Sequence, residues 1–238
     1  MTKSTLQRLA DIPADRRESA LLGLGEPELT ALLYQWEHWA RETQRTPPGD
    51  WRVWLILAGR GFGKTRTGAE FIRERVEAGT AQHIALVGAT ASDVRDTMIE
   101  GESGLLAIFP PWNRPKYEPS KRRVTFRNGA VATAFTADEP DRLRGPNHDL
   151  AWADELAAWR YPDAWDMLLL GLRIGVDPRA VVTTTPRPIE SIKALVDRPD
   201  CHVTRGSTYD NAANLSGAFL REILELYEGT TIGRQELH

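Results

Sequence analysis

The stretch LAGRGFGKTRTGAEF, residues 57–71, runs from an apolar segment through a glycine-rich turn into a helical pattern. Aligned on Ala58, the letters AGRGFGKT match a phosphate-binding pattern: a small residue, four others, then Gly-Lys-Ser/Thr. Ala58 takes the place of the usual first glycine, which a tight turn tolerates where φ is negative. The glycines let consecutive N–H groups curl around anionic oxygens, and the helix start adds its positive end. The stretch therefore predicts a strand, a phosphate-binding turn and a helix.

Lys64 and Thr65 close this pattern and indicate its ligand. The lysine is expected to reach the β- and γ-phosphates and the threonine hydroxyl to bind Mg²⁺, which implies a nucleoside triphosphate with its metal. The alternative is a strand-to-helix turn with an incidental lysine. Arg60 either contacts phosphate oxygens, reaches a neighbouring subunit or stays in solvent. The predicted nucleotide contacts of the turn and helix start are Gly59, Arg60, Gly61, Phe62, Gly63, Lys64, Thr65 and Arg66.

A second motif, LAWADE at residues 150–155, indicates the reaction. It predicts a buried strand with Asp154 and Glu155 at its carboxyl end, where ligands bind in parallel sheets. We expect Asp154 to hold Mg²⁺ together with Thr65, and Glu155 to orient and deprotonate the attacking water. An acidic pair that caps the next helix is the alternative. Kinases, GTPases and motor ATPases share the phosphate loop, but only a hydrolase needs an activated water, so the pair favours ATP hydrolysis.

Three further features fit the same chemistry. The run VVTTTP places Thr183, Thr184 and Thr185 at the end of another predicted strand, where they either contact the γ-phosphate or simply reflect β-propensity. Arg142 and Arg144 precede the acidic strand, and an arginine presented to a neighbouring subunit's γ-phosphate would stabilise transition-state charge. Surface salt bridges are the alternative for both. Gln44, upstream of the first strand, is expected to read the adenine edge.

Strands alternating with helices predict an α/β fold with a doubly wound, mainly parallel sheet and helices on both faces. Asn128-Gly129 adds a β-hairpin within residues 122–135. The phosphate loop and the acidic pair indicate a P-loop NTPase of the additional-strand, catalytic-glutamate type. We expect an N-terminal helical segment at 1–50 with adenine-side contacts, an ATPase core at 51–207, and a C-terminal helical linker or lid at 208–238.

Composition narrows the class of protein. The formal net charge of -3 provides no overall basic field, so any nucleic-acid contact requires a local patch. Cys201 is the only cysteine, which excludes an internal disulfide framework and fits a reducing cytoplasm. The longest apolar runs are far shorter than the roughly 20 residues of a membrane helix. We therefore expect a soluble protein of the host cytoplasm without a membrane partner.

Taken together, these residues resemble the N-terminal ATPase domain of tailed-phage large terminase subunits, in particular the prophage and gene-transfer-agent branch. The resemblance is carried by four stretches: WARETQRTPPGDWRVWLILAGRGFGKTRTGAEF, RLRGPNHDLAWADELAAW, VVTTTPRP and YEGTTIGRQEL. They extend from residue 39 almost to the end of the chain. This coverage is much more specific than the phosphate loop alone.

The resemblance implies ATP-driven translocation of double-stranded DNA into a procapsid. It further implies a homo-oligomeric ring docked on a portal protein, with a small terminase subunit as second partner. By motif match, Lys64 and Thr65 belong to the phosphate loop, Asp154 to the metal site, and Glu155 is the catalytic glutamate. Arg144 matches a trans-acting arginine finger and Arg60 the phosphate-loop arginine. The run 183–185 matches the motif that couples hydrolysis to movement.

Large terminase subunits continue into a nuclease domain, whereas this sequence stops at GRQELH. We expect a truncated ATPase domain without nuclease activity. DNA contact is predicted from the cluster RPKYEPSKRRVTFRNG, in which Lys121, Arg122 and Arg123 are accompanied by Tyr117 and Phe126. A charged solvent face of the hairpin is the alternative. Competing functions are a nucleic-acid helicase, a small-molecule kinase, and an assembly protein in which nucleotide only sets the shape.

Overall fold

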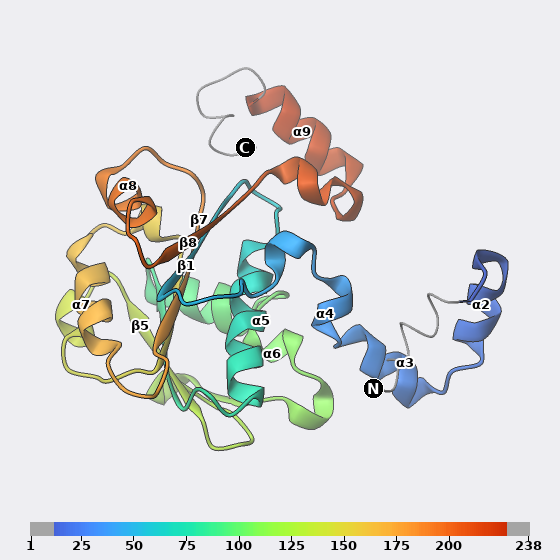
Figure 1. Cartoon of the computed structure of the whole chain (residues 1–238), viewed down its shortest axis with the longest axis horizontal. Helices are drawn as coiled ribbons and strands as arrows, with labels where there is room; N and C mark the ends of the chain where they lie inside the picture. The colour runs from blue at the N-terminus through green and yellow to red at the C-terminus, as the bar shows by residue number, and fades with distance from the viewer. Residues whose placement is uncertain (1–11, 228–238) are drawn as a thin grey trace.

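Eight strands form one sheet, whose parallel part comes from the apolar runs of the sequence. The structure is a computed structural model that describes residues 12–227 (Figure 1). The strand order is β3-β4-β5-β2-β6-β7-β1-β8, and the six strands from β5 to β8 run parallel. The strands are β1 (Val53–Ala58), β2 (His83–Gly88), β3 (Lys116–Glu118), β4 (Arg123–Thr125), β5 (Val131–Thr136), β6 (Leu150–Asp154), β7 (Arg179–Thr184) and β8 (Cys201–Gly206).

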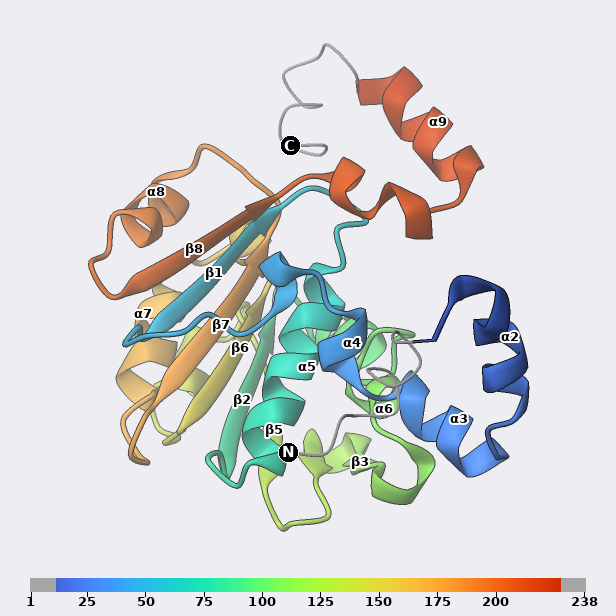
Figure 2. The same cartoon turned by 45° about the vertical axis from the view of Figure 1, so that its right-hand side comes forward.

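Helices flank both faces of the sheet (Figure 2). The α-helices are α2 (Ala14–Leu22), α3 (Glu26–Leu33), α4 (Trp36–Trp39), α5 (Lys64–Glu77), α6 (Leu105–Ile108), α7 (Asp163–Gly171), α8 (Glu190–Val196) and α9 (Gly217–Tyr227). Shorter helical pieces are η1 (Glu42–Gln44), the π-helix η2 (Asp93–Ile99), η3 (Pro111–Asn113), η4 (Pro119–Lys121), η5 (Pro140–Leu143), η6 (Leu156–Ala158) and η7 (Thr208–Asn214). None of the helices in residues 12–227 is long and apolar enough to span a bilayer.

The central strands are buried on both faces, which explains their unbroken apolar sequence. Side chains of a strand alternate between faces, so Trp54 and Ile56 of β1 pack with α5 while Val53 and Leu55 pack with α7 and α8. All six residues of β1 are buried. Two hydrophobic clusters, one on each side of the sheet, therefore hold the strands whose carboxyl ends carry the polar motifs.

Strand β7 lies between β1 and β6, so the phosphate-loop strand and the acidic strand are not neighbours. Asp154 pairs in register with Thr183, and Leu57 with Thr184. Because all three strands are parallel, their carboxyl ends meet at one edge of the sheet. The sequence prediction of an α/β fold with an additional strand and a mainly parallel sheet is confirmed.

Most predicted elements are present, and the differences have local causes. The Asn-Gly hairpin is confirmed, since β4 and β5 pair antiparallel on either side of it. The stretch SDVRDTMIEGESGLLAIF, residues 92–109, has a helical sequence pattern, but the helix is interrupted. η2 ends at Ile99, and a turn closed by the Gly104 N–H on the Gly101 carbonyl at 2.8 Å precedes α6. Strand β3 and helix α8 were not predicted. The division of the chain at residues 50 and 207 remains a prediction.

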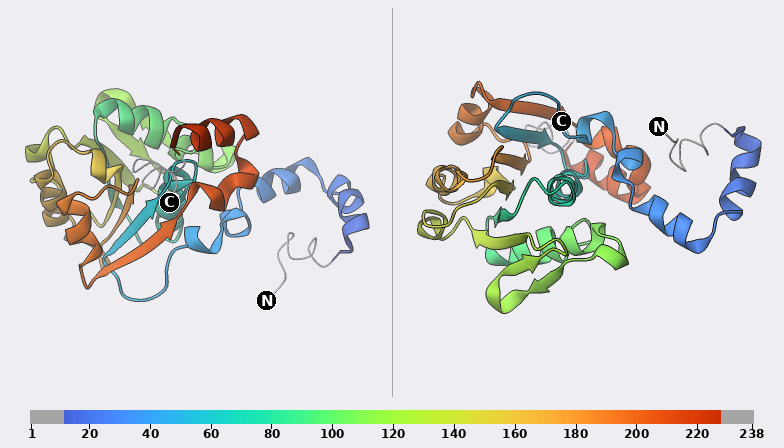
Figure 3. Two further views of the ribbon diagram at one scale, coloured as in Figure 1. Left: turned by 90° about the horizontal axis from the view of Figure 1, so that it is seen from above. Right: turned by 60° about the horizontal axis from the view of Figure 1, so that its bottom comes forward.

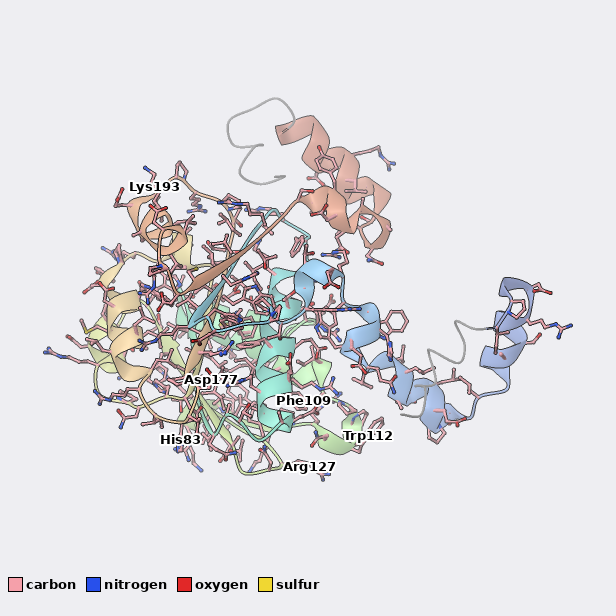
Figure 4. The ribbon with its side chains drawn as sticks, in the orientation of Figure 1. His83, Phe109, Trp112, Arg127, Asp177 and Lys193 are labelled. Atoms are coloured by element: carbon pink, nitrogen blue, oxygen red, sulfur yellow. The ribbon has the colours of Figure 1, made fainter. Side chains whose placement is uncertain are left out.

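The first and last described helices lie at different places around the sheet. Helix α9 follows β8 and lies beyond the carboxyl ends of the strands, whereas α2 and α3 extend away from the sheet on the α5 side (Figures 1 and 3). His83 and Asp177 mark the opposite edge, away from α9 (Figure 4). Most of the stretch YEGTTIGRQEL, residues 228–237, lies outside the described residues.

Candidate functional site

The turn between β1 and α5 has the backbone that its glycines permit. Gly61 and Gly63 have φ values of 73° and 96°, in the left-handed region that side chains other than glycine adopt at a cost. Helix α5 begins at Lys64, so its first N–H groups have no partner within the helix. In the described part of the chain, the N–H groups of Gly61, Gly63, Lys64 and Thr65 donate to no backbone carbonyl. The turn thus presents clustered donors suited to an anion.

Lys64 is nearly buried, with 8% of its surface exposed. Its Nζ donates to the carbonyls of Ala58 at 3.0 Å and Gly59 at 3.2 Å, and to Thr185 Oγ1 at 3.3 Å. The same Nζ lies 3.4 Å from Glu155 Oε1. A buried ammonium needs such compensation, because burial of an unpaired charge is costly. The lysine at the start of α5, after β1, and the glutamate after β6 therefore meet across the carboxyl end of the intervening β7.

Glu155 is held in a strained backbone conformation. Its φ and ψ of 48° and 48° lie in the left-handed region, which costs a non-glycine residue of order 1–3 kcal/mol. The strain is offset by contacts: the carboxylate accepts the Thr185 N–H at 3.1 Å and its Oγ1–H at 3.3 Å. The sharp turn after β6 directs the carboxylate of Glu155 toward Lys64.

Asp154, one residue earlier, is 5% exposed and belongs to a chain of buried hydrogen bonds. Trp152 Nε1–H donates to Thr183 Oγ1 at 3.0 Å, and Thr183 Oγ1–H donates to Asp154 Oδ1 at 2.5 Å. Burial raises the pKa of the Asp154 carboxyl to about 7, the Thr183 bond opposes this rise, and the Glu155 charge adds to it. A desolvated carboxylate of this kind is stabilised by a nearby cation.

The three threonines of the predicted motif point to three different places. Thr183 binds Asp154, and Thr185 binds Lys64 and Glu155. Thr184 accepts the Ala157 N–H at 3.0 Å, within the turn that follows Glu155. Since successive side chains of a strand alternate, Thr184 cannot face the same side as Thr183 and Thr185. Thr184 thus holds the turn behind Glu155, and its predicted nucleotide contact remains a prediction.

These groups open into a cleft of about 800 Å³. Among the residues that line it are the predicted ones, Arg60, Gly61, Gly63, Lys64, Thr65, Arg66, Glu155 and Thr185. Eight other lining residues were not predicted. Four of them have small side chains, Thr97, Gly101, Ser103 and Ala158, and the four larger ones are Asp96 of the π-helix η2, Glu102 after it, Arg187 after β7, and Asn211 of η7. Arg187 stands between two prolines directly after the threonine run, and that position was the available signal. The other three of these larger residues come from segments that gave no motif.

Several predicted contacts are already engaged within the protein. The Phe62 ring is fully buried, so only its backbone can face a ligand. Arg66 forms an ion pair with Glu70 at 2.6 Å while it lines the cleft. Gln44 is 5% exposed; its Nε2 donates to Thr67 Oγ1 at 3.1 Å and its Oε1 accepts the Arg41 N–H at 3.3 Å. An adenine would have to replace these bonds for Gln44 to read it, so that role remains a prediction.

The other predicted cations lie outside the cleft. Arg142 pairs with Glu139 at 3.3 Å, whereas the exposed Arg144 has no ion pair in residues 12–227. Lys121 pairs with Glu118 at 2.8 Å and Arg122 with Glu139 at 3.4 Å, and Arg123 is exposed. The predicted DNA patch is thus partly neutralised.

Phe126, expected on the surface of that patch, is buried at 3% exposure against Phe109 and cannot stack on a base. Arg127 donates to the Trp112 carbonyl, and both lie at the end of the molecule away from α9 (Figure 4). The aromatic part of the predicted patch is therefore wrong for Phe126. Its sequence position after β4, with the Phe126 N–H on the Ala130 carbonyl at 2.9 Å, turns the ring into the core.

Comparison with known proteins identifies the family. Residues 55–238 match the family described as "Terminase large subunit, T4likevirus-type, N-terminal", which covers most of the chain. The chain belongs to this family. No curated protein sequence matches it. The prophage and gene-transfer-agent branch remains a prediction.

Solved structures of terminases share the fold. The large terminase of a thermophilic bacteriophage, solved in complex with ADP, has a TM-score of 0.64 at 14% identity, over 87% of this chain and 51% of that one. The large terminase ATPase domain of Thermus phage P74-26 has a TM-score of 0.59 at 15% identity, over 94% of this chain and 97% of that one. The chain therefore spans about half the length of the first protein and nearly all of the P74-26 domain.

Oxygen donors in the terminase cleft suit Mg²⁺. The ion keeps several waters and takes few protein ligands, usually one or two carboxylates, with substrate phosphates completing its shell. Thr65 supplies a hydroxyl on the cleft wall. The buried carboxylate of Asp154 is not among the residues that line the cleft, but it directly precedes Glu155, which is one of them. The residues 12–227 contain no cluster of three His, Cys, Asp or Glu that would form a cage for a metal ion. The donor set fits an ion held jointly with a phosphate.

The strain at Glu155 predicts an inverted stability order for two substitutions. Both Glu155→Gly and Glu155→Ala remove the carboxylate, but only glycine adopts φ of 48° without cost. We expect Glu155→Gly to be more stable than Glu155→Ala by about 1 kcal/mol in urea unfolding. At the exposed helical Asp166 the order should reverse, because glycine weakens a helix. An Ala variant as stable as the Gly variant at position 155 would contradict the strain.

Proposed function

We propose that this terminase domain hydrolyses ATP and that the hydrolysis drives translocation of double-stranded DNA. One observation carries the proposal: Lys64 at the start of α5 and Glu155 after β6 converge to 3.4 Å, beside a loop in which the Gly61 and Gly63 N–H groups donate to no backbone carbonyl of residues 12–227. The convergence places an anion-binding cation and a basic carboxylate in one cleft. Hydrolysis needs both groups within reach of one phosphate.

Different residues bind the phosphates, hold the metal ion and activate the water. The loop N–H groups and Lys64 bind the phosphates, and Arg60, Arg66 and Gln44 are further proposed contacts. Thr65 and Asp154 hold Mg²⁺, which neutralises phosphate charge when bound. Glu155 orients the attacking water and accepts its proton at a carboxylate oxygen.

In this structure Lys64 Nζ and Glu155 Oε1 form an ion pair at 3.4 Å. When a phosphate binds Lys64 in place of Glu155, the Glu155 carboxylate keeps its bonds to Thr185 and becomes free to bind a water molecule. Thr185 keeps a bond to each of the two residues, so it steadies the carboxylate during the exchange.

Structures of related terminases support an adenine nucleotide as the ligand. The large terminase of the thermophilic bacteriophage has been solved in complex with ADP and with ATP-gamma-S, at TM-scores of 0.64 and 0.60 to this chain. We propose the same nucleotide here. We further propose that residues 51–207 form the ATPase core, flanked by the helical segments 1–50 and 208–238. The partners would be double-stranded DNA, a portal protein and a small terminase subunit in the cytoplasm of the host.

The first test separates hydrolysis from binding. Glu155→Gln keeps the shape but removes the base, so kcat should fall at least about 100-fold while ADP still binds. Steady-state phosphate release and calorimetric titration measure the two quantities. The exposed Glu190, in the first turn of α8, provides a matched Glu→Gln control that should retain full activity. Equal rates for Glu155→Gln and the wild type would exclude the assigned base, and an inactive wild type that still binds ADP would favour an assembly role.

Arg144 predicts cooperation between subunits. It is exposed and does not line the cleft of its own chain, so we propose that it stabilises transition-state charge in a neighbouring subunit. The ATPase rate should rise more steeply than linearly with protein concentration, and Arg144→Ala should abolish this rise. Arg142→Ala is the control, since Arg142 is held by Glu139. A strictly linear rate for the wild type would argue against a finger in trans.

Arg122 and Arg123 predict a salt-sensitive DNA contact without sequence preference. Reversing both charges to Glu should weaken binding of a duplex about tenfold or more at about 50 mM salt and flatten the salt dependence. Arg173→Glu, at an exposed arginine that contacts Asn147, changes the net charge as much as either single reversal, Arg122→Glu or Arg123→Glu, and is the control for these single variants. Unchanged affinity in the double variant would remove these residues from the DNA surface.

A further inference from the structure

We infer that Arg41 and Asn211 are positioning residues that hold the phosphate loop with its N–H groups toward the cleft. Neither residue belongs to the predicted phosphate-binding pattern, and 170 positions of sequence separate them. The inference rests on the proposed nucleotide binding. It adds a cause for the loop geometry that the glycines alone do not provide.

Three consecutive carbonyls of the loop each accept a side-chain donor from another segment of the chain. The Arg60 carbonyl accepts Thr208 Oγ1–H at 2.6 Å, and the Gly61 carbonyl accepts Asn211 Nδ2–H at 2.6 Å. The Phe62 carbonyl accepts the Arg41 guanidinium. The donors come from the segment before β1 and from η7, which follows β8, so the two flanking segments of the core grip the loop together.

The hydrogen bonds to the loop carbonyls also orient the loop N–H groups. In a trans peptide the N–H of one residue points opposite to the carbonyl of the residue before it. Binding the Arg60 carbonyl therefore directs the Gly61 N–H away from Thr208, and binding the Phe62 carbonyl directs the Gly63 N–H away from Arg41. Those two N–H groups are among the donors that have no carbonyl partner in the described chain. For the Arg60 and Phe62 carbonyls, the outer contact and the inner donor are therefore two ends of one peptide plane. The third plane, whose Gly61 carbonyl accepts Asn211, carries the Phe62 N–H, and this N–H closes the turn on the Gly59 carbonyl at 3.4 Å.

Arg41 and Asn211 also bind each other, so the two segments that contact the loop are linked directly. Arg41 Nη1 donates to Asn211 Oδ1 at 2.6 Å, and Asn214 Nδ2 donates to the same oxygen at 2.9 Å. The Arg41 guanidinium lies 4.6 Å from the centre of the buried Phe62 ring, a cation–π distance. Both the amide nitrogen and the amide oxygen of Asn211 are thereby used. A loop held in this way has little freedom to lose when a phosphate binds, which favours affinity.

The experiment measures ADP binding by calorimetry in the full chain. Asn211→Ala and Arg41→Ala should each raise the Kd for ADP about tenfold, the loss expected for one hydrogen bond of about 1.4 kcal/mol. The double variant should lose less than the product of the two factors, because both changes release the same loop. Asn147→Ala, at an exposed asparagine far from the loop in sequence, is the matched control.

A conservative variant separates positioning from general stability. Asn211→Asp keeps an acceptor for Arg41 but replaces the donor to Gly61 by a carboxylate, so its Kd should rise at least as much as in Asn211→Ala. Thermal midpoints without nucleotide should stay close to the wild type, whereas the shift produced by ADP should shrink. At saturating ATP kcat should be retained and KM should rise, as expected for lost uniform binding.

Two outcomes bear on different claims. Wild type and Asn211→Ala with equal Kd values for ADP would overturn this inference and leave the proposed hydrolysis intact. A wild-type Kd in Asn211→Asp would overturn the role of the Gly61 carbonyl. A wild-type chain that binds no ADP would overturn the proposed function and with it the inference.

Discussion

The contact between Lys64 and Glu155 is the constraint on which the site depends. The lysine ammonium is nearly buried, and its only carboxylate within 4 Å in the described residues comes from a strand that is not adjacent in the sheet. Only a parallel sheet brings the carboxyl ends of β1, β7 and β6 to one edge, so that a charge from the first can meet a charge after the last. Thr185, directly after the intervening strand, bonds to both partners. The apolar sequence of the strands is thus a condition of the polar chemistry at their ends.

The strain at Glu155 follows from the same constraint. Asp154 ends β6 in register with Thr183 and is tied to it at 2.5 Å, which leaves no extended path for the next residue to reach Lys64. A left-handed residue turns the chain sharply, and the turn is then held by Thr184 on the Ala157 N–H and by the Trp159 indole on the Asp154 carbonyl. The cost of an unfavourable backbone is met by several bonds that form only in this arrangement.

Local signals predicted much of the fold and half of the site. Apolar runs, Asn128-Gly129 and the pattern around Lys64 act over a few residues, so the parallel strands, the hairpin and the loop followed from sequence. Alternation along a strand is equally local, and it separates Thr184 from Thr185. Arg41 and Asn211 could not be found in this way, because their role exists only once segments 170 residues apart are folded together. The prediction that Phe126 lies on the surface was wrong for a similar reason, since its burial depends on Phe109, a residue distant in sequence.

Charge alone does not make the cleft attractive to phosphate. Four cationic and three acidic side chains line it in the described chain, Lys64 and Arg66 are each paired, and the whole chain is negative. The net pull on an anion therefore has to come largely from neutral dipoles, the N–H groups of the loop and the start of α5. Dipoles act only when they are oriented, whereas a charge attracts from any direction. An orientation-dependent site needs its backbone held, and the side-chain donors from Arg41, Thr208 and Asn211 to the loop carbonyls meet that need.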